Sequence, residues 1–190
     1  MTVGGKKEKM VKGTMFVDYV RLIRAQKEVA WEKYLTKEDM EIVNGRIFPA
    51  GWYPYKTFQR CGLAVLREIA NNDLGIVRQW GRITMKNLIE KTYPQVKRCN
   101  NVFEAFQSLQ AIRNTFFNFA APSYEKAGPK SVRIILEGAP NEEGVKPFCY
   151  QVVGNYDYLI EEYGGKNVQV VWEKKTWEGD DCTSFVLTWE

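Results

Sequence analysis

The segment SVRIILEG, residues 131–138, marks the point at which the sequence changes from helical to extended patterns. Val132, Ile134 and Leu136 alternate along it, and the charged Arg133 lies between the first two. A period of two residues is that of a β-strand with one buried face. The segment therefore predicts a strand, and we expect it to begin the sheet of the protein.

Three further elements are predicted between this strand and the C-terminus. An amphipathic helix is expected at about 145–163, because the glycine pair that follows it is a typical helix stop. Two strands come next, at 167–179 and 182–190, with a Gly-Asp-Asp turn between them. The C-terminal part is thus predicted as β-α-β-β.

The chain before Pro122 has apolar residues at helical spacing, interrupted by turn residues. Thr36 begins the sequence TKED, which resembles a capping box at the start of a short helix. The expected helices lie at about 14–25, 36–45, 55–72, 75–93 and 101–118. Helices followed by β-α-β-β favour an α+β domain, with N-terminal helices packed on a small, mainly antiparallel sheet.

The positive charge of the chain is concentrated near its start. The net charge is +4, and four lysines lie between residues 6 and 12. We expect residues 1–12 to be a basic flexible tail and residues 13–190 to form a single α+β domain. Because the remainder is nearly neutral, nucleic-acid binding is not predicted.

The chain contains no histidine. This excludes Ser-His-Asp and Cys-His catalytic units, imidazole acid–base chemistry and His-ligated haem or zinc. Four cysteines form no C-x-x-C pair, so we expect reduced thiols, no metal site and no cofactor. No apolar run approaches the roughly 18 residues of a membrane span, so no transmembrane segment is predicted and the expected location is cytoplasmic.

The segment IFPAGWYPYKTFQRCG, residues 47–62, combines aromatic rings with helix-breaking residues. Two interpretations stay open: its rings turn a corner in the core, or they wall a pocket for a ligand. Three of its rings and three on later helices are the candidates to line such a ligand-binding site: Trp52, Tyr55, Phe58, Trp80, Phe106 and Phe117.

Several segments together resemble known proteins: VKGTMF (11–16), GWYPYKTF (51–58), DLGIVRQWGR (73–82) and the terminal FVLTWE. They are similar to an uncharacterised, largely myxobacterial paralogous family. That family in turn resembles the superfamily of haem-NO-binding, vinyl-reductase-like and TRAPP-subunit domains. The resemblance implies an α+β fold in which the space between sheet and helices holds haem, a lipid or another apolar group.

The sequence departs from the residues that this resemblance would carry over. Haem-NO-binding members use an axial histidine on a helix that corresponds to about 103–117 here, and this chain has none. Their Tyr-x-Ser-x-Arg motif would fall near Val132, where the sequence is VRIILEGAPNEEG. The C-terminal cysteine cluster of vinyl-reductase-like relatives is reduced to Cys182. The resemblance therefore transfers no catalytic residue, haem ligand or metal site.

The function favoured by these observations is a non-enzymatic cytoplasmic sensor or regulatory domain. It would bind an apolar small molecule or lipid without His-ligated haem. The alternative is a protein-interaction or assembly module like a TRAPP subunit, or a homodimer, with Trp52 or Trp177 in an exposed patch. An enzyme is disfavoured, because no constellation of acids, bases and nucleophiles stands out.

Overall fold

The computed structural model describes residues 8–119 and 122–190. Residues 1–7 of the predicted basic tail therefore lie outside the described residues. The tail prediction needs a correction at its other end, because Met10–Lys12 form a strand, β1, and Val11 is fully buried. Backbone pairing with Trp52–Pro54 holds this short segment in place.

The helices are α1 (Gly13–Ala25), α2 (Lys37–Asn44), α3 (Tyr55–Glu68), α4 (Leu74–Lys91), α5 (Val102–Ile112) and α6 (Val145–Glu162). The strands are β1 (Met10–Lys12), β2 (Trp52–Pro54), β3 (Ser123–Gly128), β4 (Ser131–Glu137), β5 (Gln169–Lys174) and β6 (Cys182–Thr188). Helices thus precede a sheet, as the α+β prediction requires. None of the helices in the described part of the chain combines the length and the hydropathy that a bilayer crossing requires.

The larger sheet has four antiparallel strands in the order β3-β4-β6-β5. The alternation predicted for residues 131–138 is confirmed, since Val132, Ile134 and Leu136 are all buried. Ile134 pairs with Phe185 across β4 and β6, and Val132 pairs with Leu187. These side chains form the sheet's share of the core.

The sheet contains one strand more than the sequence pattern predicts. β3 precedes β4, so the C-terminal part is ββαββ rather than β-α-β-β. Its sequence SYEKAG has no alternation of apolar side chains, and it forms an edge of the sheet, where β4 is its one hydrogen-bonded neighbour among the described strands. An edge strand with a partly exposed face needs no such alternation, so the period gives no signal.

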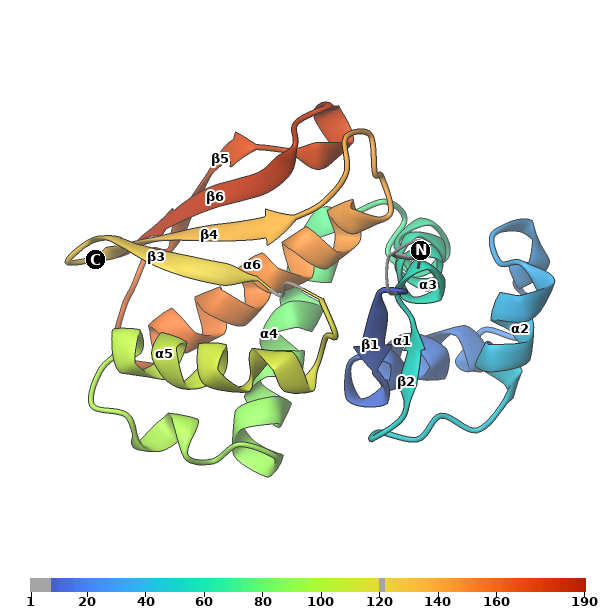
Figure 1. Cartoon of the computed structure of the whole chain (residues 1–190), viewed down its shortest axis with the longest axis horizontal. Helices are drawn as coiled ribbons and strands as arrows, with labels where there is room; N and C mark the ends of the chain where they lie inside the picture. Colours follow the sequence, from blue (N-terminus) through green and yellow to red (C-terminus); the bar gives the residue numbers. More distant parts are fainter. Residues whose placement is uncertain (1–7, 120–121) are drawn as a thin grey trace, which may run out of the picture.

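Helix α6 lies in the middle of the protein, beneath the four-stranded sheet, with α4 crossing it on the other side (Figure 1). α5 lies beside α6 under β3, and α3 reaches the N-terminal end of α6 (Figure 1). Because α6 is covered on several sides, apolar side chains such as Phe148, Val152 and Leu159 are buried along its whole length.

The α4–α6 crossing is close because each helix has a glycine at the contact. A Cβ at Gly81 would lie 2.1 Å from the carbonyl oxygen of Gln151, and a Cβ at Gly154 would lie 1.8 Å from that of Arg78. No larger residue fits either position without moving a helix. Arg78 also forms a bidentate ion pair with the buried Asp157 across the same crossing.

The N-terminal helices are joined by the carboxylate of Asp39. The predicted capping box is confirmed, since the Thr36 hydroxyl accepts from the Asp39 amide at 3.2 Å and Asp39 accepts from the Thr36 amide at 2.9 Å. Asp39 also accepts from the Thr57 hydroxyl at 2.6 Å and pairs with Arg60 of α3. One buried acid thus caps α2 and binds it to α3.

Two predicted helices end earlier in the structure. The helix expected at 55–72 ends at Glu68, and Asn71 and Asn72 adopt positive φ of 49° and 62° in the turn that follows. The helix expected at 101–118 ends at Ile112 and continues as a single 3-10 turn. Phe117 then pairs its backbone with Val11 of β1, which takes the chain out of the helix.

Candidate functional site

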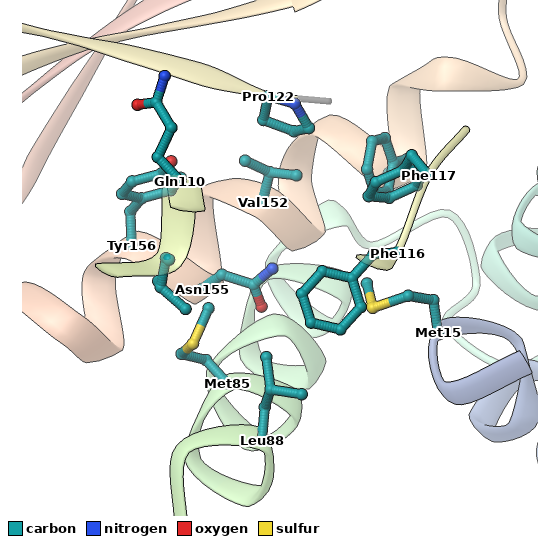
Figure 2. A pocket seen from close by; sticks show the side chains of 12 residues that line it. Met15, Met85, Leu88, Gln110, Phe116, Phe117, Pro122, Val152, Asn155 and Tyr156 are labelled. Carbon is teal, nitrogen blue, oxygen red and sulfur yellow. The ribbon is translucent and has the colours of Figure 1, made fainter. Parts of the chain in front are cut away.

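A partly enclosed cavity lies beside α6, between α1, α4 and α5, and we call it the α6 cavity. Its volume is about 90 Å³. Figure 2 shows the side chains around it, and the lining residues are Met15, Met85, Leu88, Leu109, Gln110, Phe116, Phe117, Pro122, Phe148, Val152, Asn155 and Tyr156. No charged side chain occurs among these residues, so the cavity suits an uncharged and mainly apolar group.

The lining comes from parts of the chain that are far apart in sequence. Met15 comes from α1, Met85 from α4, and Val152 from α6. Phe116 and Phe117 follow α5 and close the cavity toward α1 (Figure 2). Two methionines in the lining add adaptability, since a flexible thioether side chain fits irregular shapes.

Asn155 is one of three polar side chains that line the α6 cavity, with Gln110 and Tyr156. Its carboxamide points into the middle of the lining side chains (Figure 2). Its Oδ1 atom is shielded from solvent, and within residues 8–119 and 122–190 it accepts no hydrogen bond. A buried amide oxygen normally has a partner, so the cavity wall presents an unused acceptor.

The predicted ligand-lining residues are only partly brought together. Phe117 lines the α6 cavity. Tyr55 and Phe58 pack against Phe148, which lines the cavity, with ring centroids 6.3 and 5.7 Å from that of Phe148. Phe106 packs at 5.1 Å on Tyr156, which lines the cavity. One of these four rings therefore lines the cavity, and the other three pack against rings that line it.

The other two predicted lining residues lie elsewhere. Trp52 is 40% exposed, and the Lys12 ammonium lies 4.1 Å from the centre of its ring. Trp80 lines a surface groove between α1 and α4, together with Leu22 and Ile83. Neither ring is among the residues that line the α6 cavity, although the sequence pattern placed all six together.

Most of the cavity wall is missed by reasoning from aromatic residues, because aliphatic, thioether and amide side chains make it. The sequence does contain one usable signal. Phe148, Val152 and Asn155 follow at spacings of four and three, which places them on one face of α6. An asparagine at the end of such an apolar stripe indicates a polar group that faces the interior.

Nucleophiles and metal ligands are not gathered at this site. Burial raises the pKa of the Cys61 and Cys149 thiols to about 12, so both are protonated at neutral pH. Within the described ranges, no group of three or more His, Cys, Asp or Glu side chains is placed to hold a metal ion.

The arrangement of helices and sheet is that of the H-NOX proteins, the haem-NO-binding class. An H-NOX protein from S. oneidensis in the Fe(II)NO ligation state is 12% identical, with a TM-score of 0.66 over 94% of this chain and 99% of that chain. The unliganded Fe(II) H-NOX protein from K. algicida is 13% identical, with a TM-score of 0.66 over 94% of this chain and 96% of that chain.

Another H-NOX structure agrees less closely but over a similar length. A mutant of the H-NOX protein from T. Tengcongensis has a TM-score of 0.56 at 13% identity, over 94% of this chain and 97% of that chain. No protein-family model matches the sequence, and no curated protein matches it. At these identities the likeness establishes the fold, and the fold is the one that the sequence resemblance implied.

Proposed function

We propose that this chain is a non-enzymatic, cytoplasmic, sensor-like domain that binds a small apolar molecule in the α6 cavity. The observation that carries the proposal is the cavity itself, which is apolar, uncharged and placed against the central helix. A ligand there touches α1, α4, α5 and α6 at once, so its binding can alter how these helices pack. That is the physical requirement for a sensor.

The fold supports this proposal by analogy. Among the similar structures is one described as an oxygen binding H-NOX domain related to soluble guanylate cyclases, at 13% identity and a TM-score of 0.60. Another comes from work on the function of haem distortion in the H-NOX family. These proteins hold a ligand-binding group in the same architecture, which supports an interior site in this chain as an analogy of fold.

The residues present do not fit a His-ligated haem. The chain has no histidine to coordinate the iron. The α6 cavity is about 90 Å³, whereas sites for drug-sized ligands are roughly 300–1,000 Å³. Phe116, Phe117 and Phe148 occupy the interior with their rings. We therefore propose a ligand much smaller than haem.

Xenon is a suitable first probe, because it enters apolar cavities without needing a polar contact. Met15 and Met85 line the α6 cavity, and their methyl groups can be followed by nuclear magnetic resonance. We expect a saturable shift of both methyl signals as xenon pressure rises. The shift should vanish in Val152→Phe, which fills the cavity.

The matched control is Val171→Phe, because Val171 is 59% exposed on β5 and the same substitution there fills nothing. Its methyl shifts should equal those of the wild type. Unchanged methyl signals in the wild type at saturating pressure would contradict a ligand-accessible cavity. A saturable Soret shift on titration with haemin, abolished by Val152→Phe, would contradict the exclusion of haem.

A second candidate function is protein interaction, and the outer face of α4 favours it. Ile76, Trp80 and Ile83 follow at helical spacing, and Ile83 is 57% exposed. A groove of about 290 Å³ runs beside them between α1 and α4. An apolar stripe next to a groove can accept a second copy of the chain.

Sedimentation over a range of concentrations tests this alternative. Self-association through α4 should appear as a mass that rises with concentration and should be lost in Ile83→Glu. Val171→Glu, an equally exposed change on the sheet, should leave the association unchanged. A constant monomer mass in the wild type would argue against the homodimer.

A further inference from the structure

The α6 cavity is mainly apolar, but its wall contains one buried hydrogen-bond acceptor without a partner among the described residues, Oδ1 of Asn155. We infer that the α6 cavity selects small, uncharged ligands with one hydrogen-bond donor, which is directed at Oδ1 of Asn155. This inference rests on the proposed function, because it specifies the ligand of the same cavity. It adds the chemical class of the ligand and the protein atom that recognises it.

The unpartnered oxygen carries the first step. Asn155 Oδ1 is buried and accepts no hydrogen bond within the described residues. Leaving a buried acceptor without a partner is unfavourable, because the desolvated oxygen has lost its hydrogen bonds to water. A ligand that donates a hydrogen bond at this atom recovers part of that cost, and a ligand without a donor recovers none.

The other walls restrict the rest of the ligand. Met85, Leu88 and Phe116 surround the Asn155 carboxamide (Figure 2), and they offer only apolar contacts. An ionised ligand would lose its hydration without gaining a counter-charge, because none of the described lining residues is charged. One donor for Asn155 Oδ1 on an otherwise apolar body is the composition that this part of the wall accepts. The polar ends of Gln110 and Tyr156 lie at another part of the lining (Figure 2).

The volume sets the size of that body. A cavity of roughly 150 Å³ encloses benzene. The α6 cavity of about 90 Å³ therefore suits a smaller molecule of about four or five heavy atoms. Short-chain alcohols and five-membered N–H heteroaromatic rings meet both the size and the donor requirement.

Pyrrole and furan form the matched pair of probes. Both are flat five-membered rings of nearly the same size, but pyrrole has an N–H donor where furan has a ring oxygen. A hydrogen bond contributes about 0.5–1.5 kcal/mol net, and about 1.4 kcal/mol corresponds to a factor of ten. We expect pyrrole to bind the wild-type chain about tenfold more tightly than furan.

The experiment follows the methyl shifts of Met15 and Met85 during titration with each ring. In Asn155→Leu, which keeps the side-chain volume and removes the acceptor, the preference for pyrrole should fall to about one. The matched control is Asn87→Leu, because Asn87 lies on the exposed face of α4, outside the α6 cavity. This control should keep the wild-type preference.

The comparison of the two rings in the wild type does not depend on whether a variant folds. Xenon binding together with equal affinities for pyrrole and furan would overturn this inference and leave the proposed function standing. A pyrrole preference that persists in a folded Asn155→Leu would also overturn it. If xenon, pyrrole and furan all fail to shift the methyl signals, the proposed function fails as well.

Discussion

On the side of α6 that faces α4, backbone lies against backbone. Gly81 and Gly154 have no side chain at the two closest points of this contact, and Arg78 pairs with Asp157 beside them. On the side that faces α5, large side chains keep the helices apart and leave the α6 cavity. Helix α6 thus has one closely packed contact, with α4, and one contact that leaves a cavity large enough for a small ligand.

This difference assigns separate tasks to the two sides. A backbone-on-backbone crossing cannot slide without a clash, so it fixes α4 and α6 as one body. The side lined by Met15, Met85 and Leu109 can rearrange by changes of rotamer. Ligand binding on that side is therefore expected to move α5 or α1 relative to a fixed α4–α6 pair.

The largest effect is expected from breaking the close side. In Gly154→Ala the new Cβ would lie 1.8 Å from the carbonyl oxygen of Arg78, so one helix must move. We expect a loss of about 4 kcal/mol or more in the free energy of unfolding, measured with urea. Gly128→Ala is the control, because the nearest atom to its Cβ would be the Ser131 hydroxyl oxygen at 3.3 Å. Similar losses in both variants would contradict the account of the crossing.

A smaller effect is expected from enlarging the open side. Met85→Ala removes a buried side chain from the cavity wall and should cost about 2–4 kcal/mol. Benzene should then bind and restore part of the lost stability, because a ligand specific to the folded state stabilises it by mass action. The melting temperature with and without benzene measures this. A variant that gains nothing from benzene would show that the wall collapses.

The ion pairs give a comparison of pH dependence. Burial raises the pKa of Asp157 against the opposing hydrogen bonds from Arg78. Burial also acts on Asp39, but hydrogen bonds from Arg60, Thr57 and the Thr36 backbone outweigh it and lower the pKa to about 2. The two carboxylates differ because Asp39 has more donors.

The signs of the pH effects are therefore opposite. The stability from Asp157 is present below its unfolded-state pKa of about 4 and is lost as pH rises through its folded pKa. The stability from Asp39 is present above about pH 4 and is lost as pH falls toward 2. Relative to wild type, Asp157→Asn should gain stability as pH rises and Asp39→Asn as pH falls. Urea unfolding at a series of pH values checks this, and parallel curves would contradict it.

The smallest effect is expected from filling part of the cavity. Val152→Ile adds one methylene at the wall and should stabilise the chain by up to about 1 kcal/mol while weakening xenon binding. Val171→Ile, on the exposed face of β5, should change neither quantity. A clear destabilisation by Val152→Ile would show that the cavity is already tightly packed around that side chain.

Much of the fold could be predicted because its signals are local. Helical and strand periods, the Thr36 capping box and the turn at Asn71 each depend on a few neighbouring residues, and all appear in the structure. Strands β1 and β3 were not predictable in this way. Their pairing partners stabilise them, and neither segment has an apolar alternation of its own.

The candidate site was less predictable. Aromatic residues mark places where large areas can be buried, and four of the six predicted ones do lie in or against the cavity wall. Trp52 and Trp80 are aromatic as well, but Trp52 lies under the Lys12 ammonium and Trp80 lines a surface groove. An aromatic side chain alone does not specify whether it faces a core, a groove or solvent.

The sequence by itself determined the α+β class, the order of most elements and the absence of imidazole chemistry, because periodicity and composition are properties of the chain alone. Only the tertiary structure decided that Met15, Met85 and Asn155 meet around one cavity, and that Gly154 rests on the carbonyl of Arg78. These contacts depend on where helices cross. Crossings are fixed by the packing of the whole domain and not by any local segment.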